Sequence, residues 1–307
     1  MTGWRSASSA NDEWGEKVGI VHPGVPQPLA KFLQAALGLD VFIETGTQYG
    51  YTARWAASHF SQAHSIELSP ALWARAVEAL GDVGNLTLHQ GAKPAVLARL
   101  LPTLPGPALC GLDAHWSLGE PAGEDDPCPL LAELEAVLTQ PVQHTILIDD
   151  ARLFCAPPAL PHPAAAWPSL AKLTHALRAL GREEFFLFED VIIVPAVGDV
   201  ELLRKYLQMR DTLTSQSPLR QPLPLPEDLA ARIAAAQGPA LLALWSEAAR
   251  LVPAQVRHHV QVARLAFAQG DRAAAREAAE WAMAVDLEVA LAEDVVALRG
   301  SCGGEVG

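Results

Sequence analysis

The amino-acid sequence predicts an α/β fold: a doubly wound sheet of seven mostly parallel strands with an antiparallel edge hairpin, followed by an all-helical C-terminal extension. Up to residue 196, short β-branched runs alternate with helical patterns, which is typical of βαβ units and a parallel sheet. Beyond residue 226 the chain is rich in alanine and helical in pattern. A length of 307 residues also favours about two domains, at roughly 150 residues each.

The strands and helices follow one another in a regular order. We expect strands at residues 41–45, 63–68, 85–90, 109–115 and 144–150, and a closely spaced pair within 185–196. We expect helices at residues 27–39, 52–60, 70–80, 128–138 and 168–180. Pro70 suits a first helical turn, and Gly181 suits a helix end. The close final strand pair indicates the antiparallel edge.

The predicted domains are a tail (1–20), an α/β domain (21–200), a helix with a linker (201–226) and a helical extension (227–300). The stretch SPLRQPLPLPE at 217–227 is too rich in proline for a regular helix or a central strand. Ala248 and Ala282 are 34 residues apart, which is the period of tetratricopeptide repeats, and Ala263 and Ala275 also fit that pattern. The extension resembles about one and a half such repeats. A plain helical extension is the open alternative.

Composition excludes several classes of protein. The formal net charge is −13, which opposes an electrostatic grip on nucleic acid or on an anionic membrane. No apolar run approaches the ~18 residues of a membrane span, and the polar N-terminus does not resemble a signal peptide. The four cysteines show no zinc-binding spacing. We therefore expect a cytoplasmic protein.

Acidic residues gather where the predicted strands end. Residues 1–200 hold 22 acidic and 11 basic residues, which is a net charge of −11. Ligands of open α/β sheets bind at the carboxyl ends of the strands, and clustered carboxylates repel one another unless a cation lies among them. The polar residues at these ends are Glu44, Thr45, Gly46, Glu67, Asp113, His115, Asp149 and Asp150.

The first strand leads into a glycine turn, Gly46–Gly50. Its spacing is neither that of a dinucleotide-binding GxGxxG loop nor that of a phosphate-binding loop. Glu67 lies 23 residues after Glu44, at the end of the next strand, where a carboxylate commonly accepts hydrogen bonds from a ribose diol. The pattern favours a nucleoside cofactor. The alternative is a tight turn beside a solvated glutamate.

Four motifs in order, FIETGTQYG, SIELSP, LDAHWS and ILIDDARLF, resemble class I S-adenosylmethionine-dependent methyltransferases, which have a Rossmann-like fold. The resemblance covers residues 38–196 and is strongest to a bacterial group with ETGT, LDAH and IDDAR motifs. It implies that S-adenosylmethionine contacts Glu44, Thr45, Gly46, Gly50, Glu67 and Asp113. Gly91 is followed by Ala92 and Lys93, where the family tends to carry an acidic residue near the adenine.

The same resemblance extends to metal-dependent O-methyltransferases. It implies that Asp113, Asp149 and Asp150 hold Mg²⁺ or Mn²⁺, with Asp113 and His115 as catalytic residues and His115 as the general base. Other roles remain open: Asp150 caps the following segment or pairs with Arg152, and His115 only forms hydrogen bonds within its loop. The acidic loop at 116–127 is either a lid over this site or a solvated loop.

The leading hypothesis is therefore a methyltransferase that modifies a hydroxyl of a small-molecule or sugar-like acceptor. A second hypothesis is a catalytically degenerate scaffold whose C-terminal helices bind a protein partner or a second copy of the chain. A third, a nicotinamide-dependent oxidoreductase, is disfavoured by the spacing of Gly46 and Gly50.

Overall fold

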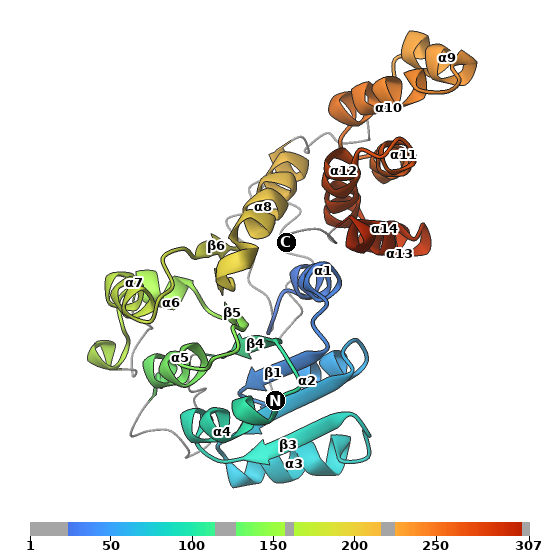
Figure 1. Ribbon diagram of the computed structural model, residues 1–307. Coiled ribbons are helices and arrows are strands. Elements are labelled where there is room, and N and C mark those ends of the chain that lie inside the picture. Colours follow the sequence, from blue (N-terminus) through green and yellow to red (C-terminus); the bar gives the residue numbers. More distant parts are fainter. Residues whose placement is uncertain (1–23, 114–126, 157–162, 216–224, 303–307) are drawn as a thin grey trace, which may run out of the picture. The chain divides into compact units, whose positions relative to one another are not determined.

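The computed structural model describes residues 24–113, 127–156, 163–215 and 225–302 (Figure 1). The chain divides into two compact units. The first unit comprises the chain up to Gln27 together with Asp40–Pro195, and the second comprises Pro28–Leu39 together with the chain from Ala196 onward. The segment 28–39 therefore groups with the C-terminal helices, although the sequence-based boundary at residue 21 places it in the α/β domain.

The first unit is built on a seven-stranded sheet, which confirms the predicted fold class. The strands are β1 (Val41–Thr45), β2 (Gln62–Glu67), β3 (Leu86–Gln90), β4 (Ala108–Leu112), β5 (Thr145–Ile148), β6 (Phe186–Phe188) and β7 (Val191–Val194). Their order is β3-β2-β1-β4-β5-β7-β6. Neighbouring strands from β3 to β5 are parallel, and β7 is antiparallel to both β5 and β6. The strand order reverses between β1 and β4.

Hydrophobic residues cover both faces of this sheet, as a doubly wound fold requires. Val41 and Ile43 belong to a core shared with the helices α4 (Lys93–Leu100), α5 (Leu130–Leu138) and α7 (Leu170–Ala179). Phe42, between them in β1, projects to the opposite face because side chains alternate along a strand. There its ring contacts those of Trp55 and Phe60. The remaining helices of this unit are α2 (Tyr51–Ala57), α3 (Pro70–Leu80) and the short α6 (Arg152–Cys155).

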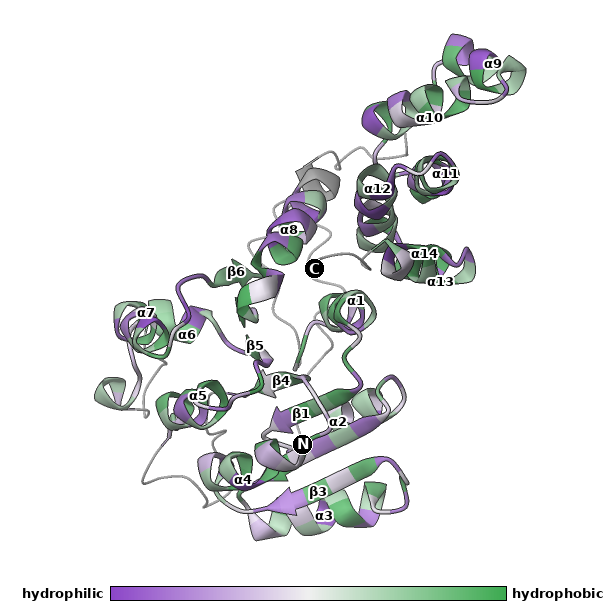
Figure 2. Ribbon diagram, in the orientation of Figure 1, coloured by the Kyte–Doolittle hydropathy of each residue, from purple (hydrophilic) through white to green (hydrophobic). Residues whose placement is uncertain are grey.

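The edges of the sheet also follow from local sequence. β3 lies at one edge and ends in hydrophilic residues, which are purple in Figure 2. At the other edge, β6 and β7 form the predicted hairpin. Its two turn residues, Glu189 and Asp190, both have positive φ, 48° and 66°. Such a turn matches the right-handed twist of the paired strands.

The second unit is all helical. Its helices are α1 (Gln27–Leu37), α8 (Val200–Ser215), α9 (Glu227–Ala235), α10 (Ala240–Leu251), α11 (Val256–Ala268), α12 (Arg272–Val285), α13 (Leu287–Ala292) and α14 (Val295–Ser301). Ala248, Ala263, Ala275 and Ala282 are fully buried, as closely packed helices require. The resemblance to tetratricopeptide repeats remains a prediction. No helix in the described ranges is both long enough and apolar enough to cross a membrane.

A buried carboxylate holds several helices of this unit together. Glu280 in α12 is only 3% exposed and accepts hydrogen bonds from Arg276 (3.1 Å) and from Arg299 in α14 (3.2 Å). Lys205 in α8 lies 3.6 Å from the same carboxylate. Arg299 also donates to the carbonyl oxygen of Ala36 in α1 at 2.6 Å. One acidic side chain therefore links α8, α12 and α14, and α1 joins them through Arg299.

We predict that Glu280→Gln lowers the free energy of unfolding by about 2–4 kcal/mol, because a buried partner of three cations loses its charge. Urea titration followed by circular dichroism measures this change. The matched control is Glu277→Gln on the same helix, which is exposed and forms no ion pair with a described residue. We expect the control to lie within about 0.5 kcal/mol of the wild type. Equal effects of the two substitutions would contradict the role given to Glu280.

Candidate active site

The candidate site lies at the carboxyl edge of the sheet, where β1 and β4 are neighbours. Backbone hydrogen bonds continue past the ends of the strands: Gly46 N donates to Ile66 O (2.8 Å), Asp113 N to Thr45 O (3.3 Å) and Asp149 N to Leu112 O (2.9 Å). These bonds fix the residues that follow β1, β4 and β5 beside one another. The parallel register thus gathers the polar strand ends that the sequence predicts.

Glu44, at the end of β1, is a buried carboxyl group with an ordered hydrogen-bond network. Ser65 lies opposite Glu44 in β2 and donates its hydroxyl to Glu44 Oε1 at 2.6 Å. The Thr47 hydroxyl contacts that of Ser65 at 2.5 Å. The pKa of Glu44 is raised to about 8, mainly by burial; the hydrogen bond from Ser65 lowers the pKa, and the nearby Asp113 and Glu67 contribute to raising it. Glu44 is therefore largely protonated at neutral pH unless a cation binds close to it.

Gly46 allows the chain to turn tightly beside Asp113. Its φ is +94°, and a Cβ atom there would lie 2.8 Å from Asp113 Oδ2. A larger residue would suffer both backbone strain and a clash with that carboxylate. Gly50, which begins α2, has a φ of +73°. The two glycines therefore have a structural reason to be glycine, independent of any ligand.

Glu67, at the end of β2, is held in place by backbone groups. Gln48 N donates to Glu67 Oε2, and Ser69 N donates to Glu67 Oε1, both at 2.9 Å. Gln48 lies in the glycine turn, and its φ of 46° is also left-handed. Each carboxylate oxygen of Glu67 keeps a further lone pair for another donor. The side chain is thus oriented in advance to accept hydrogen bonds from a ligand.

Asp113 follows β4, and its backbone is held by a lysine from the connection between β3 and β4. Lys93 Nζ donates to Asp113 O at 2.7 Å. Lys93 begins α4, a helix that is not among those expected from the sequence. A cation therefore lies beside the acidic edge, one residue after Ala92.

Asp149, after β5, has an environment suited to proton exchange. The pKa of Asp149 is raised to about 7, mainly by burial and in part by repulsion from Asp150, Asp113 and Asp190. A hydrogen bond from Asp150 N to Asp149 Oδ1 (2.8 Å) acts in the opposite direction. A carboxyl group with a pKa near 7 can both accept and release a proton at physiological pH.

The predicted metal triad is not supported. In the parts of the chain that the structure describes, no three His, Cys, Asp or Glu side chains are grouped so as to hold a metal ion. The physical reason lies in Asp150. Its backbone is left-handed (φ 57°), and its carboxylate forms an ion pair with Arg152 at 2.7 Å, as the alternative from the sequence expected. Arg152 is also bound by Asp190 of the hairpin turn. Asp150 therefore belongs to an ion-pair cluster beside Asp113 and Asp149.

Other sequence-based predictions lie outside the described residues. His115, the predicted general base, and most of the loop at 116–127 fall in the segment 114–126. Conversely, the sequence did not single out Thr47, Ser65 or Lys93. Ser65 could have been predicted from the sequence, because pairing the strands at 41–45 and 63–68 in parallel places it opposite Glu44. Lys93 depends on an unpredicted helix and had no clear signal.

No protein-family profile and no curated protein matches this sequence. Among solved structures, a proposed caffeoyl-CoA O-methyltransferase from Staphylococcus aureus is 13% identical, with a TM-score of 0.40 over 57% of this chain and 84% of the other. The N-terminal domain of EvdMO1 with SAH bound is 16% identical, with a TM-score of 0.35 over 56% and 80%. The mitomycin 7-O-methyltransferase MmcR is 15% identical, with a TM-score of 0.32 over 55% and 53%. Values this low do not assign an activity to the chain.

We predict that Gly46→Ala destabilises the α/β unit by about 1–3 kcal/mol, because alanine is strained at this φ and meets Asp113. Thermal or urea unfolding measures the loss. Gly84→Ala is the matched control, since a Cβ atom at Gly84 meets no heavy atom within 4 Å. If Gly46→Ala proves as stable as Gly84→Ala, the close approach of Asp113 is not the constraint we infer.

Proposed function

We propose that this protein is an S-adenosylmethionine-dependent methyltransferase. The observation that carries the proposal is the arrangement at the β1–β4 switch point. A glycine turn, a buried Glu44 and an oriented Glu67 lie together there, beside Asp113. Open α/β sheets bind their ligands at this point, and the motif resemblance gives these same residues to the cofactor.

The proposed roles follow from the chemistry of each group. S-adenosylmethionine supplies a methyl group on a positively charged sulfur atom, together with a ribose diol. Glu67, fixed by Gln48 N and Ser69 N, is suited to accept hydrogen bonds from the two ribose hydroxyls. Glu44 and Asp113 supply negative charge next to the glycine turn, where the methionine part with its cationic groups binds. Their crowding, which is unfavourable in the free protein, favours a cationic ligand.

We propose Asp149 as the group that takes the proton from the acceptor. A hydroxyl must lose its proton as the methyl group arrives, and a carboxylate with a pKa near 7 is suited to accept it. The acceptor class remains a small-molecule or sugar-like hydroxyl. Asp113, Asp149 and Asp150 do not fit a Mg²⁺ or Mn²⁺ ion as the described residues stand, so no step is assigned to a metal. A scaffold role, with a protein partner or self-association through the C-terminal helices, remains an alternative prediction.

One prediction of the proposed function concerns the pH dependence of cofactor binding. A bound cation favours ionised Glu44, so binding below about pH 8 must release the proton that Glu44 carries in the free protein. We therefore expect the affinity for S-adenosylmethionine to fall as the pH falls below 8, by up to about tenfold per pH unit. Calorimetric titration in two buffers with different ionisation enthalpies measures both the affinity and the protons released.

Variants make this experiment specific. Glu44→Gln should bind S-adenosylmethionine more weakly, and its affinity should no longer depend on pH. Glu67→Gln should weaken binding by about 10- to 100-fold, and its affinity should still depend on pH. Glu78→Gln, an exposed glutamate on α3, is the control and should behave as the wild type. Absence of any S-adenosylmethionine binding at millimolar concentration by the folded protein would refute the proposed function.

Another prediction of the proposed function concerns catalysis. Asp149→Asn should lower the rate of S-adenosylhomocysteine formation by about 10²–10⁴-fold, because the proton acceptor is lost while the cofactor site is kept. The assay uses the acceptor that gives the highest rate in a panel of phenols, sugars and aliphatic alcohols. Affinity for S-adenosylmethionine should change by less than about threefold. We expect turnover to survive EDTA. Complete loss of turnover in EDTA would restore the metal hypothesis, and full activity of Asp149→Asn would exclude Asp149 as the base.

A further inference from the structure

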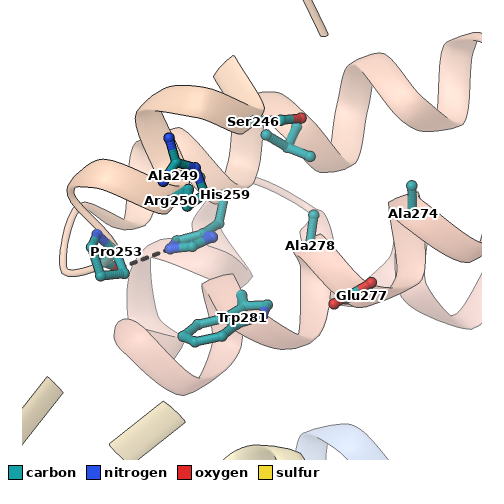
Figure 3. A pocket seen from close by; sticks show the side chains of 10 residues that line it. Ser246, Ala249, Arg250, Pro253, His259, Ala274, Glu277, Ala278 and Trp281 are labelled. Carbon is teal, nitrogen blue, oxygen red and sulfur yellow. Dashed lines mark hydrogen bonds between the residues drawn. The ribbon is translucent and has the colours of Figure 1, made fainter. Parts of the chain in front are cut away.

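The helical unit contains a cavity of its own, between α10, α11 and α12 (Figure 3). Its volume is about 490 Å³. Pockets that bind small molecules have volumes of roughly 300–1,000 Å³. Nothing in the proposed methyl transfer uses this cavity, since its lining residues all come from the C-terminal helices.

Two helical faces with the same spacing form the walls. The wall from α10 and the residues after it comprises Ser246, Ala249, Arg250 and Pro253, and the wall from α12 comprises Ala274, Glu277, Ala278 and Trp281. Ser246, Ala249 and Arg250 lie on one side of α10, with Pro253 just after the end of that helix. The four residues of α12 follow a spacing of i, i+3, i+4 and i+7, which places them on one side of α12. Figure 3 shows these two sets on separate helices. Alanine at three of the eight positions leaves the space open.

An ordered pair of rings lines the cavity at one end. His259 of α11 lies on Trp281 with ring centroids 5.4 Å apart and an interplanar angle of 7°. His259 Nε2 donates to Pro253 O at 2.8 Å, as drawn in Figure 3. Burial lowers the pKa of His259, so the ring is neutral at pH 7 and its Nδ1 is an acceptor. The rings therefore provide a rigid, uncharged aromatic surface.

The two charged groups in the lining have opposite signs and are available to a ligand. Arg250 and Glu277 are both exposed, and neither forms an ion pair with any residue of the described ranges. Their neighbours are already occupied: Glu247 pairs with Arg232, and Arg276 pairs with Glu280. The cavity thus combines one unpaired cation, one unpaired anion and an apolar, partly aromatic interior.

We propose that this cavity binds a small zwitterion with an apolar body, namely a free apolar amino acid or a dipeptide of such residues. The ligand carboxylate pairs with the Arg250 guanidinium, and its ammonium group pairs with the Glu277 carboxylate. The apolar side chain packs against Trp281, Val262 and the alanines. A ligand with both charges satisfies both residues at once, whereas a singly charged ligand leaves one unused.

The experiment is a calorimetric titration of the full-length protein with L-leucine, L-phenylalanine, L-tryptophan and their homodipeptides. Each ligand is compared with its C-terminal amide, which lacks the carboxylate, and with its N-acetyl derivative, which lacks the ammonium group. We expect at least one zwitterion to bind at millimolar concentration or below, and both blocked forms to bind at least about tenfold more weakly. S-adenosylmethionine is absent, so the outcome is independent of the proposed methyl transfer.

Two variants assign the charges. Arg250→Gln should remove the difference between the zwitterion and its amide, and Glu277→Gln should remove the difference between the zwitterion and its N-acetyl form. The matched controls are Arg257→Gln and Glu227→Gln, which change exposed residues outside the cavity and should bind as the wild type does. The proposal is overturned if no zwitterion of the panel binds, or if binding is unaffected by both Arg250→Gln and Glu277→Gln in protein with native circular dichroism.

Discussion

The site depends on one constraint: parallel strands that share a sheet place all their carboxyl ends at the same edge. In this chain the strands β1, β2, β4 and β5 each end next to an acidic residue. Glu44, Glu67, Asp113 and Asp149 are therefore brought close together in a partly buried environment, where ionised carboxylates repel one another. Burial is the main cause of the raised pKa values of Glu44 and Asp149, about 8 and about 7, and repulsion from the neighbouring carboxylates contributes to both.

Different hydrogen bonds and ion pairs offset this repulsion at each position. Glu44 receives the Ser65 hydroxyl, and Glu67 receives two backbone N–H groups. Asp150 is neutralised by Arg152, which the hairpin residue Asp190 also binds. Glu44 and Asp149 lack a comparable cation in the described residues, and they are the two groups that our proposal uses to bind a cationic cofactor and to accept a proton.

Much of this arrangement could be predicted from the sequence. The alternation of β-branched runs and helical patterns was sufficient for the sheet, and the short 189–190 turn was sufficient for its antiparallel edge. Two predictions from the sequence did not agree with the structure, one on a helix and one on a metal site. The helix α4 was not predicted, although Pro94 near its start suits a first helical turn as Pro70 does in α3. The metal triad was predicted from the resemblance to metal-dependent O-methyltransferases, yet Asp150 has a left-handed backbone and its carboxylate pairs with Arg152.

The sequence by itself therefore determined the fold class and the set of polar residues at the carboxyl edge, because both follow from periodicity and from the position of each residue in its strand. Only the tertiary structure decided which of those residues act together. Ser65 donates a hydrogen bond to Glu44, and Lys93 donates one to the backbone of Asp113; both bonds join segments that are distant in sequence. Arg152 forms an ion pair with Asp150, whose backbone is left-handed. The same holds for the cavity of the helical unit, since Arg250 and Glu277 line one cavity only when α10 and α12 pack on α11. Hydrogen bonds and ion pairs depend on distance and direction in space, and periodicity along the chain specifies neither.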